Sequence, residues 1–327
     1  MNKILLSILR CPKSGQPLTL QSDDTAGETV SGGWLLSADG QNRYPIRDGV
    51  PRFVPENNYA DNFGMQWNKF SKTQLDSHSG QPISASRFWT ATGWTREDLQ
   101  DQWVLDIGCG AGRFAEVALQ AGASVVALDY SSAVDACYAN LRQHPRLHVV
   151  QGDVYALPFR AGAFAFVYSL GVLQHTPDVA RAFAALPPML QPGGRICVDF
   201  YERSFKSALL PKYWLRPFTK RLAKPRLFNA LEFLVPKLLP VSVALGYIPV
   251  LGRHLKRAIP VANYVGSLPL AHTQQLEWSL LDTFDWLSPA YDNPQTARTV
   301  SEWLTGSGFR DVEVLKAGHL VGRGTKV

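Results

Sequence analysis

One stretch decides the fold that we predict for this chain, Val104-Leu-Asp-Ile-Gly-Cys-Gly-Ala-Gly-Arg-Phe114. It reads as a buried strand over 103–107, a turn with glycine at alternate positions, and a helix over 113–120. Glycines leave the backbone bare, so a ligand can approach it closely, and the next helix directs its free N–H groups toward that ligand. The stretch therefore predicts a nucleotide-like ligand at the first strand–helix crossover of a doubly wound α/β sheet.

Two features separate this turn from that of a nicotinamide dehydrogenase. Gly108, Gly110 and Gly112 follow the spacing G-x-G-x-G, whereas dinucleotide sites use G-x-G-x-x-G. Asp106 places a carboxylate near the end of an otherwise apolar strand, where it would repel a pyrophosphate and attract an ammonium or sulfonium group. The alternative is that Asp106 only ties down the turn. The residues favour a cationic ligand over a dinucleotide.

Alternating apolar and helical segments extend this pattern along the chain. Further strands are predicted at 124–129, 147–153, 164–169, 195–200, 308–315 and from 319 onward. Helices are predicted from Ser131 or Ser132 to about Arg142, from Asp178 to Leu190, and over 299–306, and the turn Gln191-Pro-Gly-Gly194 ends the second of them. The alternation predicts a parallel, seven-stranded Rossmann-like sheet that ends in an antiparallel pair.

Two acids stand at the ends of the second and third predicted strands. Asp129 lies seventeen residues after Gly112, close to the spacing at which an acid meets ribose hydroxyls in this architecture. A carboxylate there can accept hydrogen bonds from both hydroxyls. Asp153 follows the third strand, and the alternative for it is a plain turn residue before Tyr155.

Taken together, the glycine turn, Asp129, the pair Asp153-Val154 and the turn before the fifth strand resemble the class I S-adenosylmethionine-dependent methyltransferases, with a core of the type 11 kind. The resemblance covers about 99–201 and about the last thirty residues. It implies S-adenosyl-L-methionine as cofactor and an adenine contact at Asp153-Val154. The cofactor-binding residues that we predict are Asp106, Gly108, Cys109, Gly110, Gly112, Asp129, Tyr130, Asp153, Val154, Ser169 and Leu170.

Residues 1–54 read as a small unit of short strands separated by Gly, Pro and Asp turns. The ending Tyr44-Pro-Ile-Arg-Asp-Gly-Val-Pro51 resembles the small zinc-ribbon-like domain of the activator protein of tRNA methyltransferases. Ser14 stands where that family has its second cysteine, and Cys11 alone cannot hold a tetrahedral zinc ion. We therefore predict a degenerate, metal-free domain with a structural or interaction role.

A connector over 55–98 precedes the catalytic core. Phe63, Trp67 and Phe70 follow one another at spacings of four and three, which is typical of a helix that packs one face on the core. In methyltransferases of the fused type, a similar stretch tends to cover the cofactor. A packing helix and a cofactor lid therefore both remain open for this segment, and one helix can serve as both.

The composition of the chain indicates where in the cell the protein is located and which classes of protein it does not resemble. The 327 residues are 46% hydrophobic, with no run of about 18 uninterrupted apolar residues, so we do not expect a spanning helix. The apolar N-terminal stretch leads directly into Cys11-Pro12 without a cleavage site, so we do not expect a signal peptide. The four cysteines have neither disulfide nor metal spacing. We expect a cytoplasmic protein, with a peripheral position at the inner face of the membrane as the alternative.

The basic residues gather in one insertion. From 203 to 257 there are twelve Lys/Arg and one acid, Glu232, although the whole chain carries a net charge of only +6. Over 203–265, leucine and aromatic residues alternate with these cations and with seven prolines. This pattern fits a helical cap on the core, an amphipathic element on a membrane surface, or an RNA contact. RNA is the least favoured because no nucleic-acid-binding signature accompanies the cations.

Residues 268–296 combine Asp, His, Tyr and Trp in a segment that we predict to be a loop at the acceptor pocket. A similar D-x-x-S-P-x-Y-x-N segment, here beginning at Asp285, is found in the fused bacterial methyltransferases. With 99–202, residues 266–327 would complete the methyltransferase core around the insertion. Nothing in the sequence defines the oligomeric state.

His175 is the strongest candidate for a catalytic base because it follows the fourth strand, where the active site would open, and because a hydroxyl acceptor needs a base. The alternative is that His175 caps the next helix or packs on the cofactor. His272 and Asp285 are further catalytic candidates. A metal site formed by His272, Asp282 and Asp285 lacks tight ligand spacing, so we predict no metal.

These residues predict a methyltransferase that transfers a methyl group by in-line displacement to a small or lipid-linked acceptor, with a hydroxyl group as the preferred target. One alternative is a scaffold that binds the cofactor without turnover. RNA and protein methyltransferases are less favoured, and so is a nicotinamide dehydrogenase. The identity of the acceptor is left open by the sequence.

Overall fold

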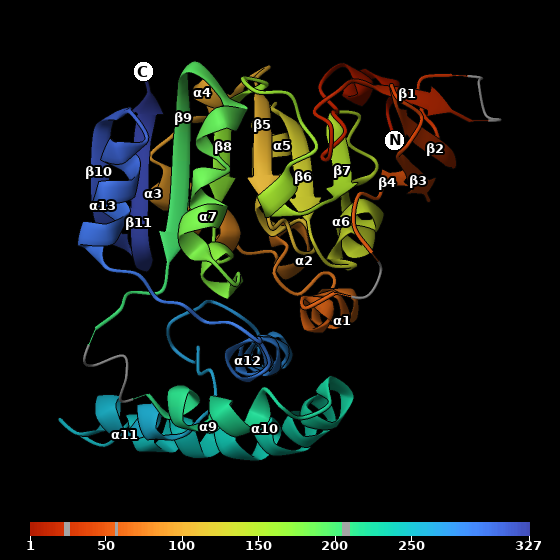
Figure 1. The fold of residues 1–327 in the computed structure, drawn as a ribbon. Coiled ribbons are helices and arrows are strands. Elements are labelled where there is room, and N and C mark those ends of the chain that lie inside the picture. The colour runs from red at the N-terminus through yellow and green to blue at the C-terminus, as the bar shows by residue number, and fades with distance from the viewer. Residues whose placement is uncertain (23–26, 56–57, 205–209) are drawn as a thin grey trace.

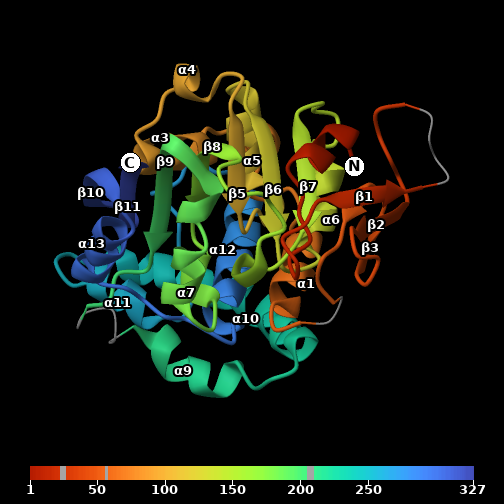
Figure 2. The same cartoon turned by 45° about the horizontal axis from the view of Figure 1, so that its top comes forward.

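The computed structural model describes residues 1–22, 27–55, 58–204 and 210–327. A large sheet with helices on both faces forms the body, and a small antiparallel sheet lies at one side of it (Figure 1). A separate layer of helices lies beyond the end of the large sheet and is joined to it through one intervening helix (Figures 1 and 2).

The large sheet has the doubly wound arrangement that the sequence predicts. Its strands are Trp103–Ile107 (β5), Ser124–Asp129 (β6), Leu147–Gln151 (β7), Phe164–Ser169 (β8), Leu190–Phe200 (β9), Phe309–Ala317 (β10) and His319–Lys326 (β11). Their order is β10-β11-β9-β8-β5-β6-β7. The strands from β9 to β7 are parallel, whereas β11 runs antiparallel to β9 and β10. The strand order reverses between β5 and β8, where α/β sheets of this kind bind ligands.

Helices cover both faces of this sheet. They are Arg113–Gln120 (α5), Ala133–Leu141 (α6), Val179–Ala184 (α7) and Ala297–Gly306 (α13), with short 3₁₀ turns Val154–Ala156 (η2), Leu173–His175 (η3) and Pro187–Met189 (η4). The helix predicted to reach Leu190 ends at Ala184, because Pro187 and Pro188 cannot continue it. Strand β9 begins at Leu190, and the predicted turn over 191–194 is an irregularity within that strand rather than a break before it.

The N-terminal unit shares its core with the large sheet. It consists of Lys3–Ser7 (η1), Leu18–Gln21 (β1), Gly33–Ser37 (β2), Arg43–Arg47 (β3) and Val50–Pro51 (β4). Leu9 and Leu35 belong to the same buried cluster as Ile107 of β5. Cys11 is buried, and its Sγ lies 3.3 Å from the hydroxyl of Tyr44. The predicted boundary at residue 54 therefore does not mark a separate core, and the likeness to a zinc ribbon stays a prediction.

The connector and the insertion are both helical. The connector holds Asp61–Lys69 (α1), Asp76–Ser79 (α2), Ile83–Thr92 (α3) and the start of Arg96–Leu99 (α4), and the insertion holds Pro211–Thr219 (α9), Lys224–Gly246 (α10) and Gly252–Ala258 (α11). Another helix, His272–Leu287 (α12), follows the insertion. The prediction of a loop over 268–296 was wrong in large part, because helix α12 occupies sixteen of these residues. Trp278, Leu281, Phe284 and Leu287 recur at every third position and are buried, which favours a helix.

Helix α10 combines length with apolar composition. Its 23 residues contain an 18-residue window with a mean hydropathy of 1.4, of which 33% is buried. By length and composition alone it would reach across a membrane, so the lack of an uninterrupted apolar run did not exclude such a helix. Phe228 and Leu231 of α10 pack on Phe284 of α12, which shows that one face of α10 is committed to the protein.

Candidate active site

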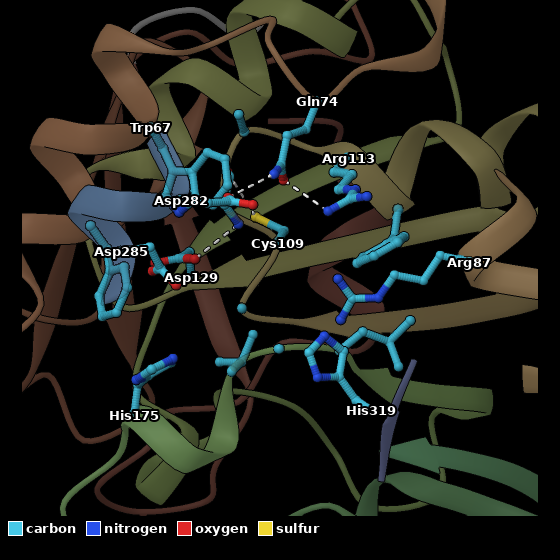
Figure 3. Close-up of a pocket in the computed structure, with 18 of the residues that line it drawn as sticks. Trp67, Gln74, Arg87, Cys109, Arg113, Asp129, His175, Asp282, Asp285 and His319 are labelled. Carbon is cyan, nitrogen blue, oxygen red and sulfur yellow. Dashed lines mark hydrogen bonds between the residues drawn. The ribbon is translucent and has the colours of Figure 1, made fainter. Parts of the chain in front are cut away.

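A cavity of about 870 Å³ opens at the carboxyl ends of β5, β6 and β8, next to the point where the strand order reverses. The glycine turn after β5 forms its floor, and α1, α3, α12 and η3 supply its walls (Figure 3). The turn between β10 and β11 closes one end through His319. Segments from both ends of the chain therefore meet in one site.

The glycine turn is shaped by close packing as well as by its backbone conformation. Gly108 has a φ of 81°, and a Cβ atom there would lie 2.3 Å from Val172. Gly110 has a φ of 52°, and a Cβ atom there would lie 3.1 Å from the ring of Trp67. Gly108, Cys109 and Gly110, which we predict to bind the cofactor, line the cavity. Gly112 begins α5 and does not line it, so its role is to start the helix.

Asp129 joins two segments of the floor. One of its oxygens accepts a hydrogen bond from the backbone N–H of Gly110 at 3.0 Å. The other accepts from the N–H and hydroxyl of Ser131 at 2.8 and 2.7 Å. Burial raises the pKa of Asp129, and these donors oppose that effect. Asp129 and Tyr130, which we predict to bind the cofactor, both line the cavity.

The predicted adenine-contacting pair also lies on the cavity wall. Asp153 accepts a hydrogen bond from the N–H of Tyr155 at 2.9 Å and so caps η2. Both proposed roles of Asp153 are compatible, because Asp153 and Val154 line the cavity in addition. Leu170 lines it too. Ser169 does not, since it is fully buried and donates to the carbonyl of Ile107 at 3.0 Å.

Asp106 does not lie where the sequence placed it. Side chains alternate along a strand, and Ile107 lines the cavity while Asp106 is buried on the opposite face of β5. Its Oδ2 atom has no hydrogen-bond partner among the described residues. Burial raises the pKa of Asp106 to about 8, and the charge of Asp129 adds to this shift. Asp106 is therefore buried behind the cavity wall and does not line the ligand cavity.

His175 lies in η3 with its ring on the cavity wall (Figure 3). Its Nδ1 is 3.0 Å from the carbonyl oxygen of Tyr291, an acceptor, so Nδ1 carries the proton in the neutral ring. The Nε2 atom is buried and has no partner among the described residues. The rings of Phe63 and Tyr201 lie 5.4 and 5.6 Å away and hold the imidazole in place. This arrangement leaves a lone pair at Nε2 for a ligand.

Two carboxylates of α12 face the same cavity. Asp285 accepts from the hydroxyl of Tyr201 at 3.4 Å, and burial raises its pKa while nearby basic side chains oppose that shift. Asp282, three residues earlier, accepts from the hydroxyl of Tyr264 and from Nε2 of Gln74. Burial raises the pKa of Asp282 to about 6. Both acids thus lie in a weakly solvated part of the site.

His272 is placed outside the site. It is exposed at the first position of α12 and does not line the cavity. Ten residues separate it from Asp282 on the same helix, a rise of about 15 Å, so the metal site that we considered for His272, Asp282 and Asp285 cannot form. Among the described parts of the chain, no group of three or more His, Cys, Asp or Glu has an arrangement that could hold a metal ion.

Several cavity residues were missed by the sequence reasoning. Gln66 of α1 is fully buried, lines the cavity, and has neither amide atom paired within the described chain. Arg113 donates to Gln74 Oε1 and to Ser84 Oγ, both at 2.9 Å. Arg87 of α3 pairs with Asp199 at 2.8 Å. Of these residues, only Arg113 could have been found from the sequence, because it directly follows the glycine turn. Gln66 and Arg87 come from distant segments.

The residues present fit S-adenosylmethionine. The bare backbone at 108–110 and the acid at the end of β6 suit the nucleoside, as the sequence argument requires. The unpartnered amide of Gln66 supplies both a donor and an acceptor. Arg113 forms no ion pair with a described acid and offers a cation to the carboxylate of the amino-acid end. Burial and the charge of Arg87 lower the pKa of Arg113 to about 10, so it stays charged at neutral pH.

Comparison with known proteins agrees with this geometry. Residues 105–198 match the model of a protein family whose description is "Methyltransferase domain". Those residues form a methyltransferase domain. The cofactor of such a domain is S-adenosyl-L-methionine. The match includes the glycine turn, Asp129, Asp153 and His175, and it supports the Rossmann-like sheet found here.

Relatives with assigned functions match about a third of the chain. A ubiquinone biosynthesis O-methyltransferase from Aromatoleum aromaticum is 34% identical over 115 residues, which are 34% of this chain and 49% of that protein. The corresponding protein from Thiobacillus denitrificans is 33% identical over 120 residues, 36% of this chain and 51% of that one. The chain thus spans about half the length of the curated relatives that it matches.

One solved structure matches over most of the chain at low identity. The 1,6-didemethyltoxoflavin-N1-methyltransferase of Burkholderia thailandensis is 16% identical, with a TM-score of 0.44. The match covers 91% of this chain and all of that one. A score of this size carries no argument about the substrate or the catalytic residues.

Proposed function

We propose that the protein is an S-adenosylmethionine-dependent O-methyltransferase that acts on a hydroxyl group of a small or lipid-linked acceptor. The observation that carries this proposal is the position of His175 on the cavity wall, where its Nδ1 lies 3.0 Å from the carbonyl oxygen of Tyr291 and its buried Nε2 has no hydrogen-bond partner among the described residues. The similarity of residues 105–198 to methyltransferase domains supports the reaction class. The relatives named as O-methyltransferases support oxygen as the target.

The residues that would hold the cofactor come from three segments. Asp129 would accept from the ribose, Asp153 from the adenine amine, and Arg113 would pair with the carboxylate of the amino-acid end. Bound S-adenosylmethionine supplies a methyl group on a cationic sulfur. Burial makes the cavity weakly solvating, and its acids Asp282 and Asp285 favour a cation there.

His175 would remove the proton from the acceptor hydroxyl. A neutral alcohol or phenol is a weak nucleophile near neutral pH, and a positioned base raises the rate by about 10²- to 10⁴-fold. The carbonyl of Tyr291 fixes the protonated nitrogen away from the cavity, so the proton is taken up at Nε2. Asp285 would stabilise the imidazolium that results, because both side chains line the same weakly solvated cavity and opposite charges attract there.

The walls that α1 and α12 contribute to the cavity favour an apolar or aromatic acceptor. Phe63 and Trp67 of α1 and Trp278 and Trp286 of α12 all line it. Rings of this size exclude water from the reacting atoms and bind flat apolar groups. Helix α1 packs on α6 and α12 and also lines the cavity, which supports the proposal that one helix both packs on the core and covers the cofactor.

The first test uses methyl-labelled S-adenosylmethionine, the purified full-length protein and an extract of the source cells, with products separated into lipid, soluble, RNA and protein fractions. We expect label in the lipid or soluble fraction. His175→Asn should lower kcat about 100-fold or more and leave cofactor affinity unchanged. His272→Asn is the matched control, because that histidine is exposed and outside the cavity.

Two results would contradict the proposal. Cofactor binding without label in any fraction would favour a scaffold role, and label confined to RNA or protein would assign another acceptor class. If His175→Asn and His272→Asn keep equal and undiminished rates with an identified acceptor, then His175 is a packing residue and the proposed base is wrong.

A further inference from the structure

We propose that the outer face of helices α9, α10 and α11 docks on the surface of an anionic phospholipid bilayer. This inference does not depend on the proposed reaction, because it rests on a surface outside the cavity. The three helices form a layer beyond α12 at the end of the molecule opposite the N-terminal sheet (Figure 1). Helix α12 packs on α9 and α10 on one side and lines the cavity with its other side.

The outer face of α10 is apolar opposite the side that packs on the protein. Phe228, Leu231 and Val235 point inward and are buried. Phe233 lies about 160° to 200° around the helix from Leu231 and Val235 and is 63% exposed. Lys237 follows one turn later, and its Nζ lies 3.3 Å from the centre of the Phe233 ring. An aromatic ring with a cation one turn away is typical of helices that lie in a membrane interface.

Helix α9 repeats this arrangement. Arg216 is buried and donates to backbone carbonyls of Trp286 and Pro289, so this side of α9 faces the protein. Trp214 and Phe218, which lie one turn apart, are 65% and 71% exposed. Arg221 is exposed just after them. The two helices thus each present aromatic residues and a cation away from the core.

The segment between α10 and α11 adds a third apolar element. Tyr247 and Val250 are 79% and 86% exposed, and Ile248 and Leu251 are exposed beside them. Val250 has a φ of 64°, a conformation that is unfavourable for a β-branched residue. Side chains of this size are costly to expose to water in one region, which indicates that a surface covers them.

Charge identifies the occupant of this face. Its exposed cations include Lys220, Arg221, Arg226, Lys237 and Arg257. The one acid in the described part of the layer, Glu232, is 3.4 Å from Lys69 of α1 and is therefore already paired. Lys212 and Arg216 are turned inward to Asp292, so they do not add to the outer charge. Apolar side chains among cations that form no ion pair with a described acid complement an anionic lipid surface, and each such cation strengthens binding about fivefold.

The geometry favours a position on the bilayer over a passage through it. Although α10 is long enough to span, its inward face is buried against α12, and Pro236 and Pro240 interrupt its hydrogen bonding. A docked layer would place the cavity one helix away from the lipid.

The test uses flotation of the full-length, cofactor-free protein with vesicles of phosphatidylcholine alone or with about one third phosphatidylglycerol. We expect binding to the mixed vesicles and at least tenfold weaker binding to the neutral ones. The variant Trp214→Ser/Phe218→Ser/Phe233→Ser should lose binding to both by more than tenfold. Ile4→Ser/Trp34→Ser removes exposed apolar side chains at the N-terminal unit and should bind as the parent does.

A second variant pair separates charge from apolar contact. Arg221→Gln/Arg226→Gln/Lys237→Gln should bind the mixed vesicles no better than the neutral ones, whereas Lys13→Gln/Arg160→Gln should keep the preference. The melting temperature of each variant reports whether it is folded. Failure of the parent to float overturns the proposal. So does undiminished binding by the aromatic variant, which would place the lipid-binding surface elsewhere on the protein, or a parent dimer that the aromatic variant dissociates, which would make the face a self-association surface.

Discussion

The buried carboxyl of Asp106 should make the protein less stable as the pH rises. Its pKa is about 8 in the folded chain and 3.8 in a model peptide, because burial disfavours the charged form. The folded state therefore keeps a proton that the unfolded chain releases, and raising the pH through this interval favours unfolding. Between about pH 5 and about pH 8 this one group should cost about 4 kcal/mol, from about three units at 1.36 kcal/mol each.

Asp106→Asn removes the titration while keeping nearly the same shape. Urea unfolding of the cofactor-free protein at several pH values measures the free energy of unfolding of the parent and the variant. The variant should gain stability relative to the parent as the pH rises, by up to about 4 kcal/mol at about pH 8. Glu97→Gln, which changes an exposed acid, is the control and should leave the pH dependence of the parent unchanged.

If the free energy of unfolding depends on pH in the same way for the parent and for Asp106→Asn, this reasoning is refuted. They would mean that Asp106 is ionised in the folded protein and has a cationic partner that the described residues do not supply. Asp106 would then be a direct ligand of the cofactor, as the sequence analysis predicts. The same reasoning predicts that Asp106→Asn weakens cofactor binding less than a substitution at Asp129 does.

Two further substitutions test the floor of the cavity. Asp129→Ala should weaken cofactor binding more than about tenfold by calorimetry, since it removes charge-assisted hydrogen bonds; Asp135→Ala, at the exposed partner of Arg52, is the control, and equal affinities would exclude Asp129 from the site. Gly108→Ala should lower both the melting temperature and cofactor affinity, whereas Gly40→Ala, which has a similar positive φ in open space, should cost only the backbone strain of about 1–3 kcal/mol. Equal effects at both glycines would show that crowding by Val172 is not important.

The sequence determined the central sheet and much of the cofactor floor. The strands at 103–107, 124–129 and 164–169 and the helix at 113–120 have the bounds that the sequence predicted. These segments are encoded locally, by apolar runs that end at glycine or an acid, so neighbouring residues were sufficient to find them. The same local signals placed Gly108, Asp129 and Asp153 at the carboxyl edge of the sheet.

Only the tertiary structure decided which side chains enter the cavity. Asp106 and Ile107 are neighbours, yet strand alternation and the packing on each face put only Ile107 on the wall. His272 and Asp285 share a helix, but the burial of its apolar side directs Asp285 inward and leaves His272 in solvent. Gln66, Arg87 and Asp282 come from distant segments, and their meeting depends on long-range packing that no local pattern encodes. Likewise, only the tertiary structure shows which face of α9 and α10 is exposed, because α12 packs against their other face.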